Sequence, residues 1–238
     1  ISSGKGSEKL KDLIDQKGNL SRKQLIGFNL AKNLTEQAGG ANNRSFYYAR
    51  ASFCYGANVH YNTLLLSINN DSDKYLEKTL INAAKLDKIT DNKSIHTIND
   101  LQAYMIVKER ITQSAEFLEK AITAKNKSID EENENIAYAI ERLNSAIAWS
   151  EFFDIGGKEY NIKESSLRDS CINKLSETEE QFQYLQLFFE SPLTGVRNKL
   201  NDVHGEYNKQ NYALCLYKAS LIKAEINSIL SSLGVSKD

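Results

Sequence analysis

The chain has 238 residues, of which 41% are hydrophobic and 26% are charged, and its 30 basic and 31 acidic residues leave a net charge of −1. This composition is typical of a folded globular chain rather than a disordered one. The charge balance excludes the basic excess that drives binding to nucleic acid or to an anionic membrane surface.

Residues that break helices are rare, with one proline (Pro192) and 12 glycines in the whole chain. Proline costs about 3 kcal/mol inside a helix, so its scarcity favours helices. No segment alternates like a strand between hairpin turns. The sequence therefore predicts an all-α fold of about nine helices in antiparallel hairpins, either tetratricopeptide-like or an irregular bundle or short solenoid. The predicted helices are 7–15, 21–38, 43–69, 72–89, 96–126, 130–154, 164–190, 193–207 and 209–233.

The N-terminal region 1–20 is predicted to be a flexible segment with one short helix, because SSGKGSEK is polar. A start at Ile1 rather than at methionine suggests a mature or excised piece of a larger, exported or membrane-associated protein. Residues 21–238 are predicted to form a single helical domain, with units 21–90, 96–191 and 193–234. Ser21 opens SRKQ, which has the spacing of a capping box with Gln24. Gly39 and Gly40 are predicted to follow the first long helix.

The stretch FYYARASFCYGANVHYNTLLL carries four of the twelve tyrosines and overlaps an uncharged run from Ala51 to Asn70. Such a run approaches the length of a membrane span. Asn58, His60 and Asn62 would bring polar groups into the hydrocarbon, so no membrane insertion is predicted.

Apolar side chains in this stretch instead occupy two faces at helical spacing. A helix that is apolar over most of its circumference has neighbours on both sides. The sequence therefore predicts a central helix in which Tyr48, Phe53 and Tyr61 are mostly buried.

A local pattern of Tyr-Ala, a large residue and then a small residue occurs three times. Small residues at these spacings let a partner helix approach closely. The pattern is explained either by repetition of a helical hairpin or by a chance match among amphipathic helices. Its small positions are Ala49, Gly56, Ala139, Ala146, Ala213 and Ser220.

No catalytic, cofactor-binding or metal-binding residues are predicted. His60, His96 and His204 lack metal-ligand spacing, and His60 is interpreted as a core residue. The cysteines Cys54, Cys171 and Cys215 are interpreted as small buried hydrophobes, with a disulfide or a reactive thiol as alternatives. The acidic groups 130–134 and 177–180 are interpreted as helix starts or solvated faces.

Aromatic residues before the DIGG turn give the best candidate for a partner groove. Core packing is the competing interpretation, since large aromatic residues dominate cores as well as interfaces. The candidate residues are Trp149, Phe152, Phe153, Tyr138 and Tyr212.

Six Asn-x-Ser/Thr sequons occur, at Asn19, Asn33, Asn43, Asn70, Asn92 and Asn126. A chain this rich in Asn and Ser produces several sequons by chance, so they support export only weakly.

Two stretches resemble known families. GEYNKQNYALCLYKASLIKA has the loose Tyr…Ala…Tyr…Ala spacing of tetratricopeptide-type hairpins, without that family's glycine and terminal proline. SFYYARASFCYGANVHY is similar to the helical region that follows the catalytic domain of archaeal Lon-like serine peptidases, some of them membrane-associated. Such proteins carry a Ser-Lys dyad in a separate α/β domain. Nothing in this chain matches that domain, so no catalytic residue is carried over.

Taken together, these observations predict a non-catalytic helical interaction or scaffold domain that binds a protein or peptide, because stacked hairpins leave an extended surface. The alternative is an accessory C-terminal domain of a Lon-like peptidase whose catalytic domain lies outside this chain. We do not predict an enzyme from this chain alone, and the sequence leaves the compartment and the oligomeric state open.

Overall fold

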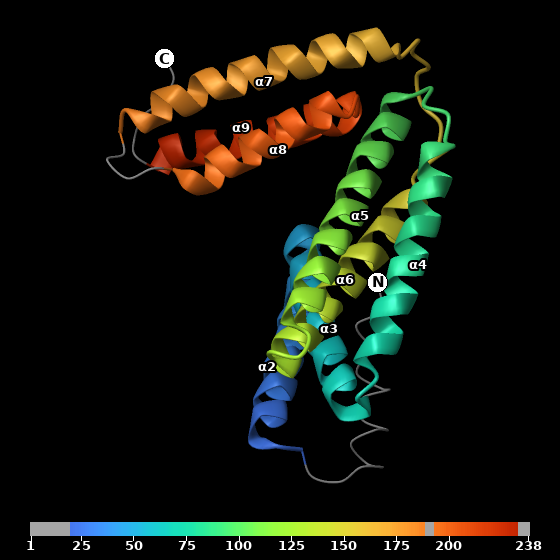
Figure 1. The fold of residues 1–238 in the computed structure, drawn as a ribbon, viewed down its shortest axis with the longest axis vertical. Coiled ribbons are helices and arrows are strands. Elements are labelled where there is room, and N and C mark those ends of the chain that lie inside the picture. Colours follow the sequence, from blue (N-terminus) through green and yellow to red (C-terminus); the bar gives the residue numbers. More distant parts are fainter. Residues whose placement is uncertain (1–19, 189–192, 233–238) are drawn as a thin grey trace. The chain divides into compact units, whose positions relative to one another are not determined.

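The computed structural model describes residues 20–188 and 193–232, and within these ranges the chain forms eight helices and no strand (Figure 1). The predicted all-α class is confirmed, and the predicted helix 7–15 lies outside the described residues. The helices are α2 (Arg22–Asn43), α3 (Tyr47–Asn69), α4 (Ser72–Asp91), α5 (Ile98–Ala124), α6 (Ile129–Ser150), α7 (Glu164–Gln186), α8 (Thr194–Asn208) and α9 (Tyr212–Ser232).

The chain divides into two compact units that are not consecutive in sequence. The first contains the described part of Ile1–Asn92 together with Arg110–Trp149, and therefore α2, α3, α4, the second half of α5 and most of α6. The second contains Lys93–Glu109 and the described part of Ser150–Asp238.

In the first unit, α2 begins with the predicted capping box: the Gln24 backbone N–H donates to Ser21 Oγ over 3.3 Å, and Ser21 N–H donates to Gln24 Oε1 over 3.0 Å. The helix then runs to Asn43, so the prediction that Gly39 and Gly40 follow its end is wrong. Both glycines have open space beside them, and the helix continues through them until the chain turns at Arg44.

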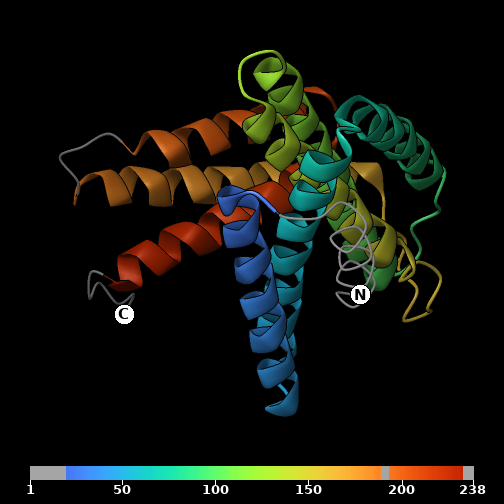
Figure 2. The same cartoon turned by 90° about the horizontal axis from the view of Figure 1, so that it is seen from below.

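Helices α2 and α3 form a hairpin and pack along their lengths (Figure 2). Their shared core is formed by Ala31, Ala57, Tyr61 and Leu64. Gly56 marks a close approach, since a Cβ placed there would lie 3.3 Å from Leu34 Cδ1.

The other side of α3 packs against α5 and α6. A second buried cluster joins Val59 and Leu66 of α3 to Ala121 of α5 and to Ile136 and Ala137 of α6. Helix α3 therefore has neighbours on both sides, as its two apolar faces predict.

The predicted burial along α3 is confirmed for Tyr61, holds only in part for Phe53 and fails for Tyr48. Tyr61 is 3% exposed, as predicted, and Phe53 is half-buried. Tyr48 is 91% exposed, so that prediction is wrong. The reason is positional: α3 begins at Tyr47, and Tyr48 lies in the first turn, beside the reversal from α2.

In the second unit, α7, α8 and α9 pack around one apolar core, which includes Leu175, Leu185, Val203 and Ile226. Cys171 of α7 and Cys215 of α9 form a disulfide in this core, with Cα atoms 5.7 Å apart. All three cysteines are buried, as predicted, but the favoured interpretation as simple hydrophobes is wrong for this pair.

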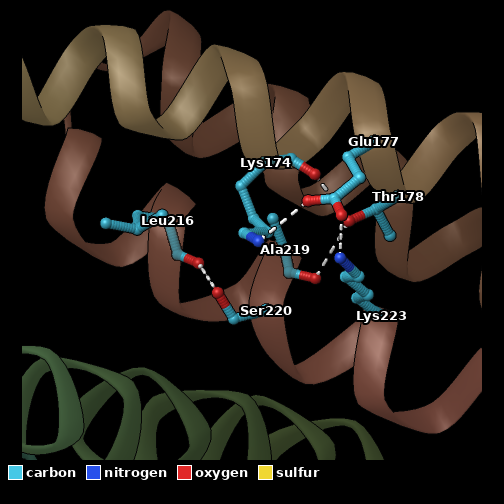
Figure 3. Close-up of polar contacts among 7 residues, drawn as sticks. All are labelled: Lys174, Glu177, Thr178, Leu216, Ala219, Ser220 and Lys223. Carbon is cyan, nitrogen blue, oxygen red and sulfur yellow. Dashed lines mark hydrogen bonds and ion pairs between the residues drawn. The ribbon is translucent and has the colours of Figure 1, made fainter. Parts of the chain in front are cut away.

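Polar contacts join α7 to α9 beside that core (Figure 3). The buried Thr178 hydroxyl lies 2.6 Å from Lys174 O and 3.3 Å from Ala219 O, so it can donate within α7 or across to α9. Glu177 accepts from Lys174 at 2.8 Å and forms an ion pair with Lys223. These two lysines lower the pKa of the Glu177 carboxyl to about 2, and Lys174 has the larger effect.

The small positions of the recurring pattern differ in burial. Ala139, Ala146 and Ala213 are buried, which fits close helix packing. Ser220 is exposed and donates within its own helix to Leu216 O at 2.8 Å, so its predicted packing role is wrong (Figure 3). It lies on the outer face of α9, one residue after the buried Ala219.

Asp100 holds the start of α5 and the segment after α6 together within the second unit. Its buried carboxylate accepts from the backbone of His96, Thr97 and Asp154 at 3.3, 2.9 and 3.2 Å, and from the Thr97 hydroxyl at 2.8 Å. Nearby, Asn99 Nδ2 donates to Gly156 O over 2.8 Å, where Gly156 has a φ of 89°. The positive φ at this predicted turn is one that glycine adopts without strain.

Among the helices that the structure describes, none is both long enough and apolar enough to cross a membrane.

We expect Gly56→Leu to lower the free energy of unfolding by about 1–3 kcal/mol, because the added side chain overpacks the contact with Leu34. The matched control is Gly40→Leu, which places the same side chain at a helical position with open space. The control should be neutral or slightly stabilising, since glycine is a poor helix former. Urea melts of both variants give the comparison, and equal shifts would contradict the close approach.

We expect Asp100→Ala to lower the free energy of unfolding by about 1–3 kcal/mol at neutral pH, because it removes the acceptor of several buried donors. Hydrogen bonds lower the pKa of the Asp100 carboxyl from its usual 3.8, and the bond from the Thr97 side chain has the largest effect. The stabilisation is therefore complete above that value and is lost as pH falls through the lower, folded-state pKa. Urea melts of the parent and of Asp100→Ala at several pH values measure this difference in the free energy of unfolding. Asp202→Ala, at an exposed position, is the control. A difference between parent and Asp100→Ala that grew as the pH fell would contradict the prediction.

Candidate functional site

A buried carboxylate surrounded by amides lies between α3 and α6 in the first unit. Glu141 is 7% exposed. Its Oε1 accepts from Asn62 Nδ2 and Asn144 Nδ2, both at 2.9 Å, and its Oε2 accepts from Asn58 Nδ2 at 3.1 Å. Asn58 and Asn62 lie one helical turn apart on α3 and so reach the same group.

An aromatic and cationic layer lies next to this cluster. The Phe117 and Tyr138 rings stack with centroids 4.9 Å apart, and the Tyr55 centroid lies 6.4 Å from Tyr138. The Arg142 guanidinium lies over the Tyr55 ring at 4.7 Å, which is a cation–π contact. Burial raises the pKa of the Tyr55 hydroxyl, which has no hydrogen-bond partner among the described residues.

The chemistry of the Glu141 cluster is that of a structural contact. Burial raises the pKa of the Glu141 carboxyl, and the three amides, which favour the charged form, only partly oppose this. The bonds from Asn58 and Asn62 tie α3 to the Glu141 carboxylate on α6. Within the described residues, no three His, Cys, Asp or Glu side chains are placed to hold a metal ion.

The most exposed aromatic residues lie at the turn between α2 and α3. Phe46, Tyr47 and Tyr48 are 58%, 68% and 91% exposed. With Arg44 and Arg50, which are also exposed, they form the surface named here the aromatic end.

Backbone bonds fix the conformation of this turn. Phe46 N–H donates to Ala41 O at 2.9 Å, and Ser45 N–H donates to Asn42 O at 3.0 Å. Arg50 Nη1 donates to Asn42 Oδ1 at 2.5 Å, which ties the first turn of α3 to the end of α2. The aromatic end is thus held by a hydrogen-bonded turn between two packed helices.

The aromatic end is locally basic. Arg44 and Arg50 are the only formally charged side chains between Glu36 and Asp71. Phe46 at the N-cap makes no side-chain hydrogen bond to the helix start, and the first turn of α3 has no acidic residue. Exposed N–H groups and the helix dipole add positive potential at that point.

The residues of the predicted partner groove are placed in both units. Tyr138 lies in the aromatic layer of the first unit, and Trp149, 37% exposed, lies at that unit's last residue. In the second unit Phe153 is 7% exposed and Lys93 lies over its ring, whereas Phe152 is 49% exposed. Tyr212 lies 5.5 Å from Tyr207 between ring centroids. A groove formed by these five residues stays a prediction.

Sequence reasoning assigned the aromatic end to the buried spine of α3. One signal was available: FYY comes directly after Asn-Asn-Arg-Ser, a polar stretch typical of a chain reversal. The Glu141 cluster had a weaker signal, since Asn58 and Asn62 stand at a spacing of four in an apolar helix.

Comparison of this chain with models of protein families, with curated proteins and with solved structures finds no match.

We expect the stability of the parent relative to Glu141→Gln to fall as pH rises above 4.5, the ordinary pKa of the carboxyl. A raised folded-state pKa means that the folded chain binds the proton more tightly than the unfolded chain, so ionisation favours unfolding. The variant cannot ionise at this position. Its free energy of unfolding should therefore rise relative to that of the parent between pH 4.5 and the folded-state pKa, and the difference should stay constant at higher pH.

Urea melts from pH 4 to 8 measure this difference directly. Glu116→Gln, at an exposed position on α5, controls for the loss of one negative charge. A parent that gains stability over Glu141→Gln with rising pH would contradict the assigned direction.

Proposed function

We propose that this chain is a non-catalytic helical interaction domain that binds a protein or peptide partner through the aromatic end of the α2–α3 hairpin. The observation that carries the proposal is the exposure of three consecutive aromatic residues, Phe46 to Tyr48, at a turn held by backbone hydrogen bonds. Contiguous exposed aromatic side chains are costly in water and are enriched at binding surfaces.

The geometry of the aromatic end supports recognition of a short polypeptide segment. Tyrosine offers a rigid apolar ring and a polar hydroxyl, so Tyr47 and Tyr48 can bury area without losing much side-chain freedom. The underlying hairpin is closely packed at Gly56, which limits the cost of ordering the surface on binding.

The charges of the aromatic end indicate the chemistry of the partner. Arg44 and Arg50 flank the rings, and no carboxylate lies near them in the sequence. Guanidinium groups pair with carboxylates in a planar, two-point geometry. The partner segment is therefore one with acidic residues beside aromatic or aliphatic ones.

We further propose that the hairpins are of tetratricopeptide type. Two pairs of helices that are adjacent in sequence support this. Three residues (44–46) join α2 to α3, and three residues (209–211) join α8 to α9. The buried Ala57 lies in the core between α2 and α3, and the buried Ala219 lies in the core that α7, α8 and α9 share.

A second candidate is the accessory helical domain of a Lon-like serine peptidase. The specific observation in its favour is that the stretch resembling that family, SFYYARASFCYGANVHY, contains Phe46, Tyr47 and Tyr48. In that role the aromatic end would contact either the peptidase domain or its polypeptide substrate. The test adds this chain to a purified Lon-like peptidase domain and measures peptide cleavage. A change that Tyr47→Ala/Tyr48→Ala abolishes would support the role, and unchanged cleavage would count against it.

The proposed function is tested by selecting binders from a phage-displayed library of random dodecapeptides. We expect enriched peptides to combine Asp or Glu with aromatic or aliphatic residues. The Kd of each synthetic peptide is then measured by fluorescence polarisation. Tyr47→Ala/Tyr48→Ala should raise Kd at least about 10-fold, because central aromatic residues dominate such interfaces.

The matched control is Ile81→Ala/Ile89→Ala, which truncates two exposed apolar side chains on α4. It should leave Kd unchanged, and circular dichroism should show both variants folded. Added salt should weaken binding, since Arg44 and Arg50 are exposed. Peptides that bind the tyrosine variant as tightly as the parent would rule out the aromatic end as the binding surface.

A further inference from the structure

We propose that Asn70 and Asn126 are acceptor sites for N-linked glycans. Both stand in Asn-x-Ser sequons, Asn70-Asp71-Ser72 and Asn126-Lys127-Ser128.

The two asparagines occupy equivalent positions at one end of the first unit. Asn70 ends α3 and Asn126 follows α5, and both have left-handed backbones, with φ of 56° and 67°. Both are exposed, and both line one cavity of about 590 Å³ between the turns. Glycans on them would project from the same end of the unit without displacing any buried group.

Neither side-chain amide is used to hold the fold. The structure gives no hydrogen bond from the Asn70 or Asn126 amide to any other described residue. Asn33 and Asn92, two further sequon asparagines, differ in this respect. Gln37 donates to Asn33 Oδ1 at 3.1 Å within α2, and Asn92 Nδ2 donates to Lys88 O at 2.8 Å at the end of α4. Asn70 and Asn126 are therefore free to carry a sugar at no cost in internal bonds.

The cavity wall suits a sugar. Asp73, Lys74 and Lys125 line it, and Asp73 and Lys125 form an ion pair with each other, so the wall is polar and charged. The sequon serines are already engaged, since Ser72 Oγ donates to Asn133 Oδ1 at 2.5 Å and Ser128 Oγ accepts from Glu131 N–H at 3.2 Å. The modification thus precedes folding, while the sequons are still accessible to a transferase.

The disulfide gives an independent reason to place the chain where such transfer occurs. Cys171 and Cys215 are fully buried and lie at a Cα separation that a disulfide spans. Disulfides persist in oxidising compartments, which are also where N-glycosylation takes place. Sequons and a disulfide in one chain point to the same compartment.

The reaction is a group transfer from an oligosaccharide linked to a polyprenyl pyrophosphate. The asparagine Nδ2 forms a bond to the anomeric carbon, and the bond between that carbon and the pyrophosphate oxygen breaks. The lipid pyrophosphate leaves with the bonding electrons, and the amide nitrogen gives one proton to a base of the transferase. No oxidant or reductant is required.

The test is mass spectrometry of the protein purified from its native cells. Trypsin releases residues 51–74 with Asn70, and a glutamate-specific protease releases 120–131 with Asn126. We expect both peptides to carry hexose-containing additions that fragment to the bare peptide, whereas the peptide with Asn208, an exposed asparagine outside any sequon, stays unmodified. Unmodified Asn70 and Asn126 in the native protein would overturn the proposal.

Two further measurements test the assignment. Asn70→Asp and Asn126→Asp keep a side chain that tolerates a left-handed backbone but cannot accept a glycan, so each should remove one glycan from the intact mass. Alkylation of the protein unfolded in urea, without reduction, should leave Cys171 and Cys215 unlabelled. Labelling of both cysteines in freshly isolated protein would place the chain in a reducing compartment and overturn the proposal.

Discussion

The packing of α3 on two sides is the constraint on which the first unit depends. The helix is apolar over most of its surface, so it must bury one face against α2 and the other against α5 and α6. Each buried apolar side chain contributes roughly 1.5–3 kcal/mol in transfer free energy. The first turn of α3 lies beside the reversal from α2, and its aromatic residues Tyr47 and Tyr48 are exposed to solvent there.

Two buried carboxylates respond to pH in opposite directions because their partners differ. Asp100 accepts several hydrogen bonds from backbone donors and one hydroxyl at a helix start, which stabilise its charged form. Glu141 lies inside a helix bundle, where three amides only partly offset the loss of water. Both carboxylates tie segments that are distant in sequence, so each specifies which segments meet as well as contributing to stability.

The proposed interaction surface and the proposed glycan sites occupy different turns of the first unit. The aromatic end lies at residues 44–50, between α2 and α3. Asn70 and Asn126 follow the C-terminal ends of α3 and α5. Since α3 has 23 residues and a helix rises about 1.5 Å per residue, its two ends lie roughly 30 Å apart. A glycan attached at Asn70 therefore starts at the opposite end of α3 from the tyrosines proposed to bind a partner.

The sequence by itself determined the helical class, most helix positions, the capping box at Ser21 and Gln24, and the two-sided burial of α3. These follow from local periodicity and from pairs of residues close along the chain. Only the tertiary structure decided that α5 is shared between two units, that Cys171 meets Cys215, that Asn58 and Asn62 converge on Glu141, and that Tyr48 is exposed. Each of these depends on which helices become neighbours, and an amphipathic pattern shows that a face is buried without showing what covers it.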